Sequence, residues 1–390
     1  MYGYLMILVI AANAGLQGWV AIYTNFAKEV VHVDGFGIGV SQSVREIPGF
    51  LTFLVIYILF FVKEHRLSAW SVILLGIGIS ITGFFTSFAG LLFTTFTMSV
   101  GFHYFETTNK SLTVQHFNPL ESATVFARLR GYGALANIAV GIIIWALSFV
   151  LPYKFNFLIL GIFIFATGAY MLFADPIKSE VPHQSKKLIL KKRYWLYYLL
   201  NFLSGARRQI YTVFAIFLLV DKFQLSVSTV AGIYVANYAL TYIFNPLISR
   251  AINQYGERVV LSLESGSLIL LFTGYALIDN VYVVVGLFLI DNVFMNFSIG
   301  LNTYLQKTAD KKDLGSLTAV GFTINHLSAV FIPLFGGFMW LLNWKLPFLI
   351  GACLTFVSLI FTQMIKTAFH HKGRMIEELN TLGTVSERIK

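Results

Sequence analysis

Apolar residues fall into twelve long stretches along this chain, and polar residues gather in the shorter segments between them. A bilayer core of about 30 Å needs about 20 apolar residues per helix, and each stretch approaches that length. Because a helix satisfies its own backbone hydrogen bonds in lipid, stretches this long and continuous favour helices over barrel strands. The pattern therefore predicts an all-α polytopic membrane protein with twelve transmembrane helices. The expected spans are 4–27, 37–61, 69–88, 90–112, 124–150, 155–174, 195–219, 227–250, 259–278, 281–305, 315–342 and 346–367.

A basic segment that contains Pro176 and Pro182 separates the first six spans from the last six. A weak internal repeat also aligns 103–109 on the fourth span with 296–302 on the tenth. Parallel repeats are typical of transporters whose substrate site lies between two halves, so two six-helix bundles are expected. The predicted units are an N-terminal bundle at 1–174, a cytoplasmic linker at 175–194, a C-terminal bundle at 195–368 and a cytoplasmic tail at 369–390.

The basic residues predict the orientation in the membrane. Only 12% of the residues are charged, against about 25% in a soluble domain, so most of the chain cannot face water. If the N-terminus lies inside, 21 lysines and arginines fall on the inner side and four on the outer side. The positive-inside rule then predicts cytoplasmic termini in an inner or plasma membrane. The same bias accounts for the net charge of +10, so no nucleic-acid partner is expected.

Two adjacent arginines on the seventh span, Arg207 and Arg208, are the strongest functional signal. An ionisable side chain at the centre of a spanning helix costs about 2.5–3.5 kcal/mol, so it needs a partner. Arg208 shares a helical face with Asn201, Ser204 and Tyr211, and of these Asn201 and Tyr211 are predicted substrate contacts. A guanidinium group binds a carboxylate or phosphate through two parallel hydrogen bonds, so both arginines are predicted substrate contacts. The alternative is that they pair with carboxylates across the bundle and only shape it.

Three acidic side chains and one histidine are candidates for carrying a coupling proton. On the fourth span, His103 and Glu106 are three residues apart and share a face, so they either carry a proton together or form a fixed polar pair. Asp291 on the tenth span is a second proton-site candidate or the partner of Arg208. On the second span, Glu46 is a further candidate.

Arg45 stands next to Glu46 and three residues before Pro48. Adjacent helical residues point about 100° apart, so the two charged side chains are expected to meet different neighbours. Together they are predicted to gate the outer half of the path, or else to form a structural ion pair with another helix beside a proline kink.

Polar side chains at mid-depth on other spans predict a cavity. The alternative is that each makes an interhelical hydrogen bond, worth about 0.6 kcal/mol. The fourth span alone supplies too few ligands for a metal, so no metal site and no cofactor are expected. The further substrate-contact candidates are Asn13, Gln17, Tyr234, Asn237, Asn296 and Asn325.

The segment after the eighth span resembles a signature loop of the major facilitator superfamily, whose form is G-x-x-x-D-R-x-G-R-R. Here 249–258 reads SRAINQYGER, in which Gly256 and Arg258 match and Asn253 replaces a carboxylate. The glycine-rich eleventh span, with 331–337 reading FIPLFGG, is a closer likeness. The resemblance covers nearly the whole chain and implies a divergent member. It also implies that Gly256 and Arg258 act in the conformational change, and that the first, fourth, seventh and tenth helices line a central cavity.

The resemblance implies a secondary active transporter that works by alternating access, as a monomer in the lipid bilayer. No nucleotide-binding motif is present, so a gradient, expected to be of protons, would supply the energy. The arginines favour a small anionic or polar organic substrate. A drug/proton antiporter is an alternative that is weakened because the fifth span has glycines at 131, 133 and 141 but no Gly-Pro pair. A non-transporting receptor or scaffold is a remote alternative, and an enzyme is not expected.

Overall fold

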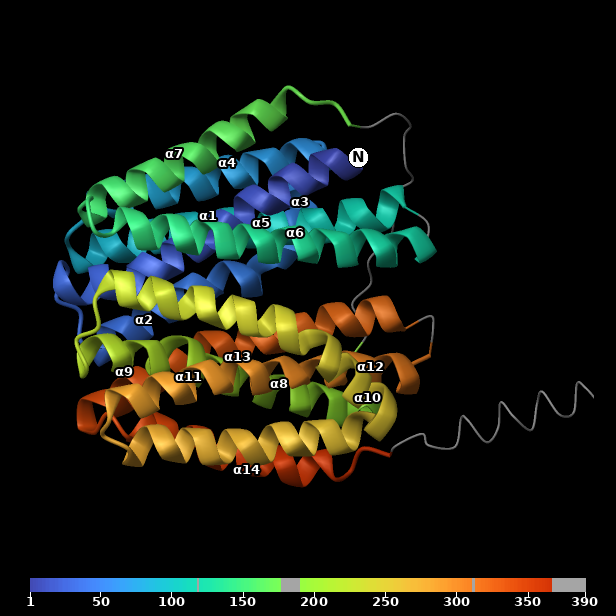
Figure 1. Ribbon diagram of the computed structural model, residues 1–390. Helices are drawn as coiled ribbons and strands as arrows, with labels where there is room; N and C mark the ends of the chain where they lie inside the picture. The colour runs from blue at the N-terminus through green and yellow to red at the C-terminus, as the bar shows by residue number, and fades with distance from the viewer. Residues whose placement is uncertain (118, 177–189, 311–312, 367–390) are drawn as a thin grey trace, which may run out of the picture.

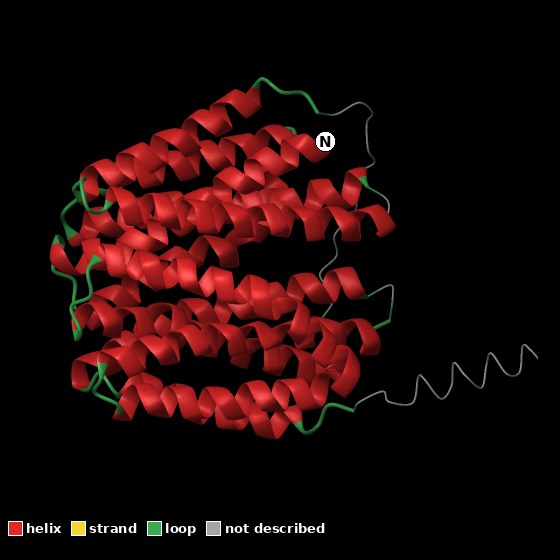
Figure 2. Cartoon of the chain, viewed as in Figure 1, coloured by secondary structure: helices red, strands yellow, loops and turns green. Residues whose placement is uncertain are grey.

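The computed structural model describes residues 1–117, 119–176, 190–310 and 313–366, and these form helices and loops with no strand among them (Figure 2). The all-α membrane fold predicted from the sequence is confirmed. The first half contains α1 (Tyr2–Glu29), α2 (Gly35–Phe50), the 3-10 segment η1 (Leu51–Leu54), α3 (Val55–Ile58), α4 (Glu64–Thr82), α5 (Phe88–His116), α6 (Pro119–Leu147) and α7 (Tyr153–Leu172). The second half contains η2 (Lys192–Tyr194), α8 (Trp195–Gln209), η3 (Ile210–Ala215), α9 (Ile216–Asp221), α10 (Val227–Leu277), α11 (Val281–Met295), η4 (Asn296–Ser298), α12 (Ile299–Thr308), α13 (Leu314–Leu342) and α14 (Leu346–Thr362).

The helices fall where the hydrophobic pattern places the spans. By length and composition, eight helical stretches in the described residues can cross a membrane, and α14 is a shorter apolar helix. Some expected spans are composite: the seventh runs through α8, η3 and α9, and the tenth through α11, η4 and α12. The arrangement is consistent with twelve spans.

Helix α10 differs from the expectation of two separate spans, because helical structure continues from Val227 to Leu277. The chain turns sharply at Gly256, whose φ of 80° and ψ of 165° place it outside the helical region. A side chain at this position would be strained, since positive φ favours glycine. The turn between the eighth and ninth spans is therefore a single-residue break.

The two halves lie one above the other in Figure 1, with α1–α7 above and α8–α14 below. Within the halves, α4 packs on α5 and α7, and α8 packs on α13 and α14. The predicted boundaries of the two bundles stay a prediction. Most of the predicted linker, at 177–189, and the tail at 369–390 lie outside the described residues. The end of the molecule where α1 begins is called the basic end, and the opposite end, where α1 leads to α2, is called the short-loop end.

The two halves meet closely near the short-loop end. Helix α2 packs against α13, and α6 packs against α10. A Cβ atom on Gly39 would lie 2.2 Å from the carbonyl oxygen of Pro333, so only glycine permits this approach of α2 and α13. Lys28 forms an ion pair with Asp221 at the same end. Small residues allow helices to pack closely in lipid, where the hydrophobic effect does not drive helix association. The short-loop end is therefore closed between the halves.

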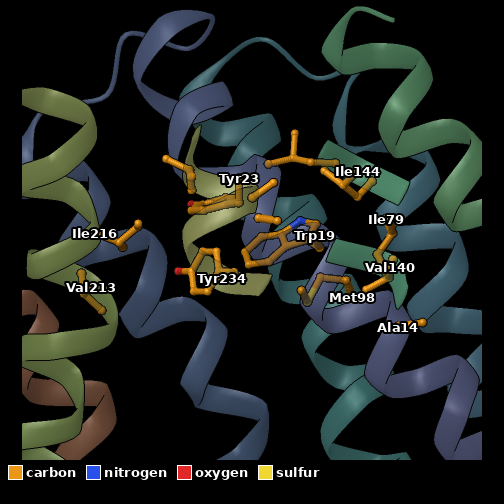
Figure 3. Packing of buried hydrophobic residues seen from close by; sticks show 14 of the residues in the cluster. Ala14, Trp19, Tyr23, Ile79, Met98, Val140, Ile144, Val213, Ile216 and Tyr234 are labelled. Carbon is orange, nitrogen blue, oxygen red and sulfur yellow. The ribbon is translucent and has the colours of Figure 1, made fainter. Parts of the chain in front are cut away.

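Buried aromatic side chains form the core beside this closure. Trp19 and Tyr23 on α1 stack with their ring centroids 4.0 Å apart, and both are almost fully buried. Figure 3 shows Tyr234 from the second half beside them, with Met98 and Val140 on the other side of Trp19. The packed core thus continues from one half into the other.

Candidate functional site

Two cavities lie between the halves at the middle of the molecule. Cavity 1 has a volume of about 220 Å³, and cavity 2 has a volume of about 450 Å³. Cavity 1 is lined by Gln17, Trp19, Val20, Tyr23, Thr24, Gln42, Arg45, Arg208, Gln209, Tyr211, Thr212, Tyr234, Asn237, Tyr238, Phe288 and Asn292. Cavity 2 is lined by Leu16, Arg45, Glu46, Met98, Ser99, Phe102, His103, Glu106, Lys110, Arg208, Phe322, Asn325 and His326.

Arg45 and Arg208 line both cavities, and they come from different halves. Arg208 on α8 donates from Nη2 to Oδ1 of Asn325 over 2.8 Å. Arg45 on α2 contacts Glu46, with 2.6 Å between Nη2 and Oε1. The Nε donors of both arginines are buried and have no hydrogen-bond partner among the described residues. Buried donors without partners are rare, so these two groups are available to an acceptor on a bound molecule.

The pair between Arg45 and Glu46 corrects the expectation that the two side chains meet different neighbours. The long arginine side chain folds back to its neighbour, while the other carboxylate oxygen of Glu46 lies 2.8 Å from Nδ1 of His326. His326 belongs to α13, so Glu46 joins the two halves. Both alternatives for Arg45 and Glu46, gating and a structural ion pair, are compatible with this contact.

Glu106 is held by a lysine on its own helix. Nζ of Lys110 lies 2.7 Å from one carboxylate oxygen of Glu106, and the same ammonium group lies 4.3 Å from the ring centroid of Phe322. Nδ1 of His103 is 3.9 Å from the other oxygen of Glu106, which is too far for a hydrogen bond. The expected common face of His103 and Glu106 is present, and both line cavity 2.

Aromatic rings and amides line cavity 1. Tyr211 stacks on Phe288 with ring centroids 4.7 Å apart, and its hydroxyl accepts a 2.7 Å hydrogen bond from Asn237. Tyr238 donates to Gln17 across the boundary between the halves. A flat or apolar molecular surface can pack on these rings, while the amides satisfy its polar groups.

Asp291 and Arg207 lie in the C-terminal half and line neither cavity. Arg207 is buried and contacts Glu264 on α10, with 3.2 Å between Nη2 and Oε1. Asp291 is fully buried beside the Tyr275 hydroxyl, and neither of its oxygens accepts a well-aligned hydrogen bond from the described residues. Of the two alternatives for Asp291, the pair with Arg208 is not formed, because Arg208 is bound to Asn325.

Of the remaining predicted contacts, Asn13 bonds to the backbone of its own helix, and Asn201 bonds to the carbonyl of Tyr197. Asn296 in η4 donates to the carbonyl of Asn292. None of these three lines a cavity.

The two residues of the signature-like loop lie far from both cavities. Gly256 makes the break in α10, and Arg258 donates to Gln363 at the basic end. Whether they act in the conformational change stays a prediction.

Several buried acidic and histidine residues were not selected as site residues from the sequence, and Glu264 and His326 are the two whose side chains contact selected residues. Glu264 lies inside the ninth expected span, so the rule that singled out Arg207 also applies to it. His326 follows Asn325 on the eleventh span, and its partner Glu46 is 280 positions away. Nothing in the sequence connects those two positions.

The cavities carry an excess of positive charge. Counting histidine as neutral, the charged residues around them are Arg45, Arg208, Lys110, Glu46 and Glu106. In a water-poor space between helices, this excess of one positive charge attracts an anion.

The sequence matches the profile of the Major Facilitator Superfamily over residues 5–333 and again over 197–374. A comparison with curated proteins found no match. Among solved structures, a mutant of the nucleoside transporter NupG has a TM-score of 0.78 at 17% identity, covering 94% of this chain and 100% of that one.

Two other structures are also similar. A bacterial homologue of the iron transporter ferroportin, in the inward-facing state, has a TM-score of 0.75 at 14% identity, with 93% and 98% of the two chains covered. The human organic anion transporter MFSD10 (TETRAN) has a TM-score of 0.64 at 12% identity, with 93% and 98% covered. At these identities the likeness shows a shared fold.

Proposed function

Because this chain belongs to the major facilitator superfamily, we propose that it is a secondary active transporter of a small organic anion, coupled to protons. Its bilayer-crossing helices support a multi-pass membrane protein. The observation that supports an anionic substrate is a pair of arginines, one from each half. Both line the two cavities, and their Nε donors have no partner among the described residues.

A carboxylate or phosphate between Arg45 and Arg208 would take up these donors. Charge-assisted hydrogen bonds to both groups would draw the two halves toward the ligand. Arg45 would then share its charge between the ligand and Glu46, which weakens the contact between Arg45 and Glu46. Because a ligand shifts a conformational equilibrium only through its different affinity for the two states, an anion held by both halves favours the state in which they approach.

The aromatic and amide lining of cavity 1 suits the rest of such a molecule. Tyr211, Phe288 and Tyr234 offer ring faces and edges, and Asn237 lies among them. The volume of about 220 Å³ limits the solute to a small one.

Asp291 is the site that we propose for the coupling proton. Glu106 already has Lys110 as a partner, whereas Asp291 is buried without a cation of its own. Arg207, the cation that acts on Asp291, is bound to Glu264. An uncompensated buried charge is unfavourable, and a bound proton removes it. Tyr211 lines cavity 1 and is close enough to Asp291 for the charge of the carboxylate to act on it, so we propose that it couples the two places.

The drug/proton antiporter remains the alternative function, and its substrates would include organic cations. The positive excess around the cavities opposes an organic cation, which, unlike a metal ion, forms no coordinate bonds that would offset the repulsion. The lack of a Gly-Pro pair on the fifth span also argues against the antiporter.

Reconstitution of the purified protein into liposomes tests the function. An imposed pH gradient should drive uptake of members of a panel of labelled small carboxylates and phosphate esters, and a protonophore should abolish it. Accumulation of organic cations with no uptake of anions would replace this proposal with the antiporter.

We also propose that the basic end is cytoplasmic, so that the closed short-loop end faces outward. In a chain with Cys353 replaced by serine, single cysteines at positions 154, 185 and 345 should differ in their labelling. An impermeant reagent applied outside should label 154 and 345 but not 185. Labelling of 185 alone would reverse the orientation.

A further inference from the structure

We propose that Glu46, His103 and His326 form a binding site for a divalent transition-metal ion of the zinc type, and that the ion bridges the two halves. The side chains come from α2, α5 and α13, and each offers one ligand atom within 4.8 Å of the others. Two imidazoles and a carboxylate are ligands that zinc and related ions take, with a further position for water.

The fold removes the sequence-based argument against a metal. The fourth span alone offers too few ligands, but α2 packs against both α5 and α13, and this brings Glu46 and His326 to His103. All three residues are buried, with 2% to 5% of their surface exposed. A site assembled from three helices is held more rigidly than one on a loop.

A glycine makes room for the two imidazoles. A Cβ atom on Gly49 would lie 2.5 Å from Nδ1 of His326 and 2.9 Å from Cε1 of His103. The two rings therefore meet edge to face, with their centroids 4.9 Å apart. Any larger residue at position 49 would push the rings apart.

His103 also has a buried nitrogen without a partner, which is an independent sign of a missing ligand. Its Nδ1 accepts or donates no hydrogen bond among the described residues, and the side chain is 5% exposed. Leaving such a group unsatisfied costs about 1–3 kcal/mol. Binding a metal through the imidazole, with a water bound to the ion near Nδ1 or with Nδ1 itself as ligand, would satisfy it.

The contact with Arg45 is compatible with a metal. Arg45 holds Oε1 of Glu46, and Oε2 faces His326 at 2.8 Å. Ligating carboxylates are commonly held by hydrogen bonds to their other oxygen, so Arg45 would orient the ligand from outside. Because the ligands belong to both halves, a bound ion should stabilise the present conformation, in which the short-loop end is closed.

Zinc binding by the purified full-length protein tests the site. The parent for this experiment carries His183→Gln, His370→Gln and His371→Gln, which removes the histidines outside the described residues. We expect one Zn²⁺ per chain in a titration, and at least about a tenfold loss of affinity in His103→Gln and in His326→Gln. His65→Gln is the matched control, because His65 is a buried histidine in the first turn of α4 and is not one of the three proposed ligands.

Thermal unfolding separates a lost site from a damaged fold. Without zinc, the variants should melt close to the parent, and zinc should raise the Tm of the parent and of His65→Gln only. Spin labels at Phe36 and Leu341, both exposed at the short-loop end, should show a shorter and narrower distance distribution when zinc is added. Equal zinc affinity in the parent and in the His103→Gln/His326→Gln double variant would overturn the proposal, as would the absence of stoichiometric binding to the parent.

Discussion

Replacing Arg208 by lysine should weaken binding of the transported anion by about tenfold to a hundredfold. Lysine keeps the charge but loses the planar pair of donors, and a hydrogen bond to a charged group contributes about 1.5–3 kcal/mol. The loss should appear as a higher KM for uptake into proteoliposomes, with little change in the amount of folded protein. The Arg208→Lys variant also loses the hydrogen bond between Arg208 and Asn325. Asn325→Ala, which removes the same bond but keeps the arginine, should therefore be measured alongside it.

Arg207→Lys is the matched control, because Arg207 is the neighbouring residue but is buried on Glu264 and lines neither cavity. Lysine keeps the charge but loses the forked donors with which Arg207 contacts both Ser265 and Glu264 in a buried place. We therefore expect Arg207→Lys to lower the Tm and the yield while leaving the KM of the surviving protein unchanged. If instead Arg208→Lys lowers only stability and leaves KM unchanged, Arg208 has a structural role and the substrate class is open again.

Replacing Asp291 by asparagine should abolish accumulation of substrate against its gradient. Asparagine has nearly the same shape but cannot bind and release a proton, so the pH gradient could no longer drive transport of the substrate. Exchange of labelled for unlabelled substrate across the membrane should continue, because it needs no net proton movement. Uptake under an imposed pH gradient and counterflow at equal pH measure the two activities separately.

Glu106→Gln distinguishes the two carboxylates. The sequence favours Glu106 as the proton carrier, whereas the contact with Lys110 favours a structural role for it. We expect Glu106→Gln to keep pH-driven accumulation at a reduced rate. Normal accumulation in Asp291→Asn, together with loss of accumulation in Glu106→Gln, would show that Glu106 carries the coupling proton.

The hydrophobic pattern predicts most of the fold because span length and loop polarity are local properties. The central arginine is also predictable, since Arg208 is too costly at mid-membrane to lack a partner. The partner of Arg208 is not predictable from the sequence, because the choice between Asp291 and Asn325 depends on how α13 packs against α8. A local change of helix type adds to this: the π-helical segment η3 begins at Ile210, two residues after Arg208, and alters the register of Tyr211.

The site residues contributed by α13 show the limit of sequence reasoning most clearly. Glu46 and His326 are 280 positions apart, and taken alone each fits the role of an ordinary buried polar residue. Their contact arises only because Gly39 lets α2 approach the backbone of α13. One sequence supplies no covariation that could have connected the two positions.

The ion pair between Lys28 and Asp221 makes the molecule sensitive to salinity on one side only. The two side chains close the short-loop end while 39% and 24% of their surfaces remain exposed to solvent. The screening length in solution falls from about 10 Å at 0.1 M salt to about 3 Å at 1 M, so strong brine at that end loosens the closure. No comparable described ion pair joins the halves at the basic end, since Lys191 and Arg193 bind Asp313 within the second half. A change in salt concentration at the short-loop end should therefore alter how long the protein dwells in this conformation, while the same change at the basic end should not.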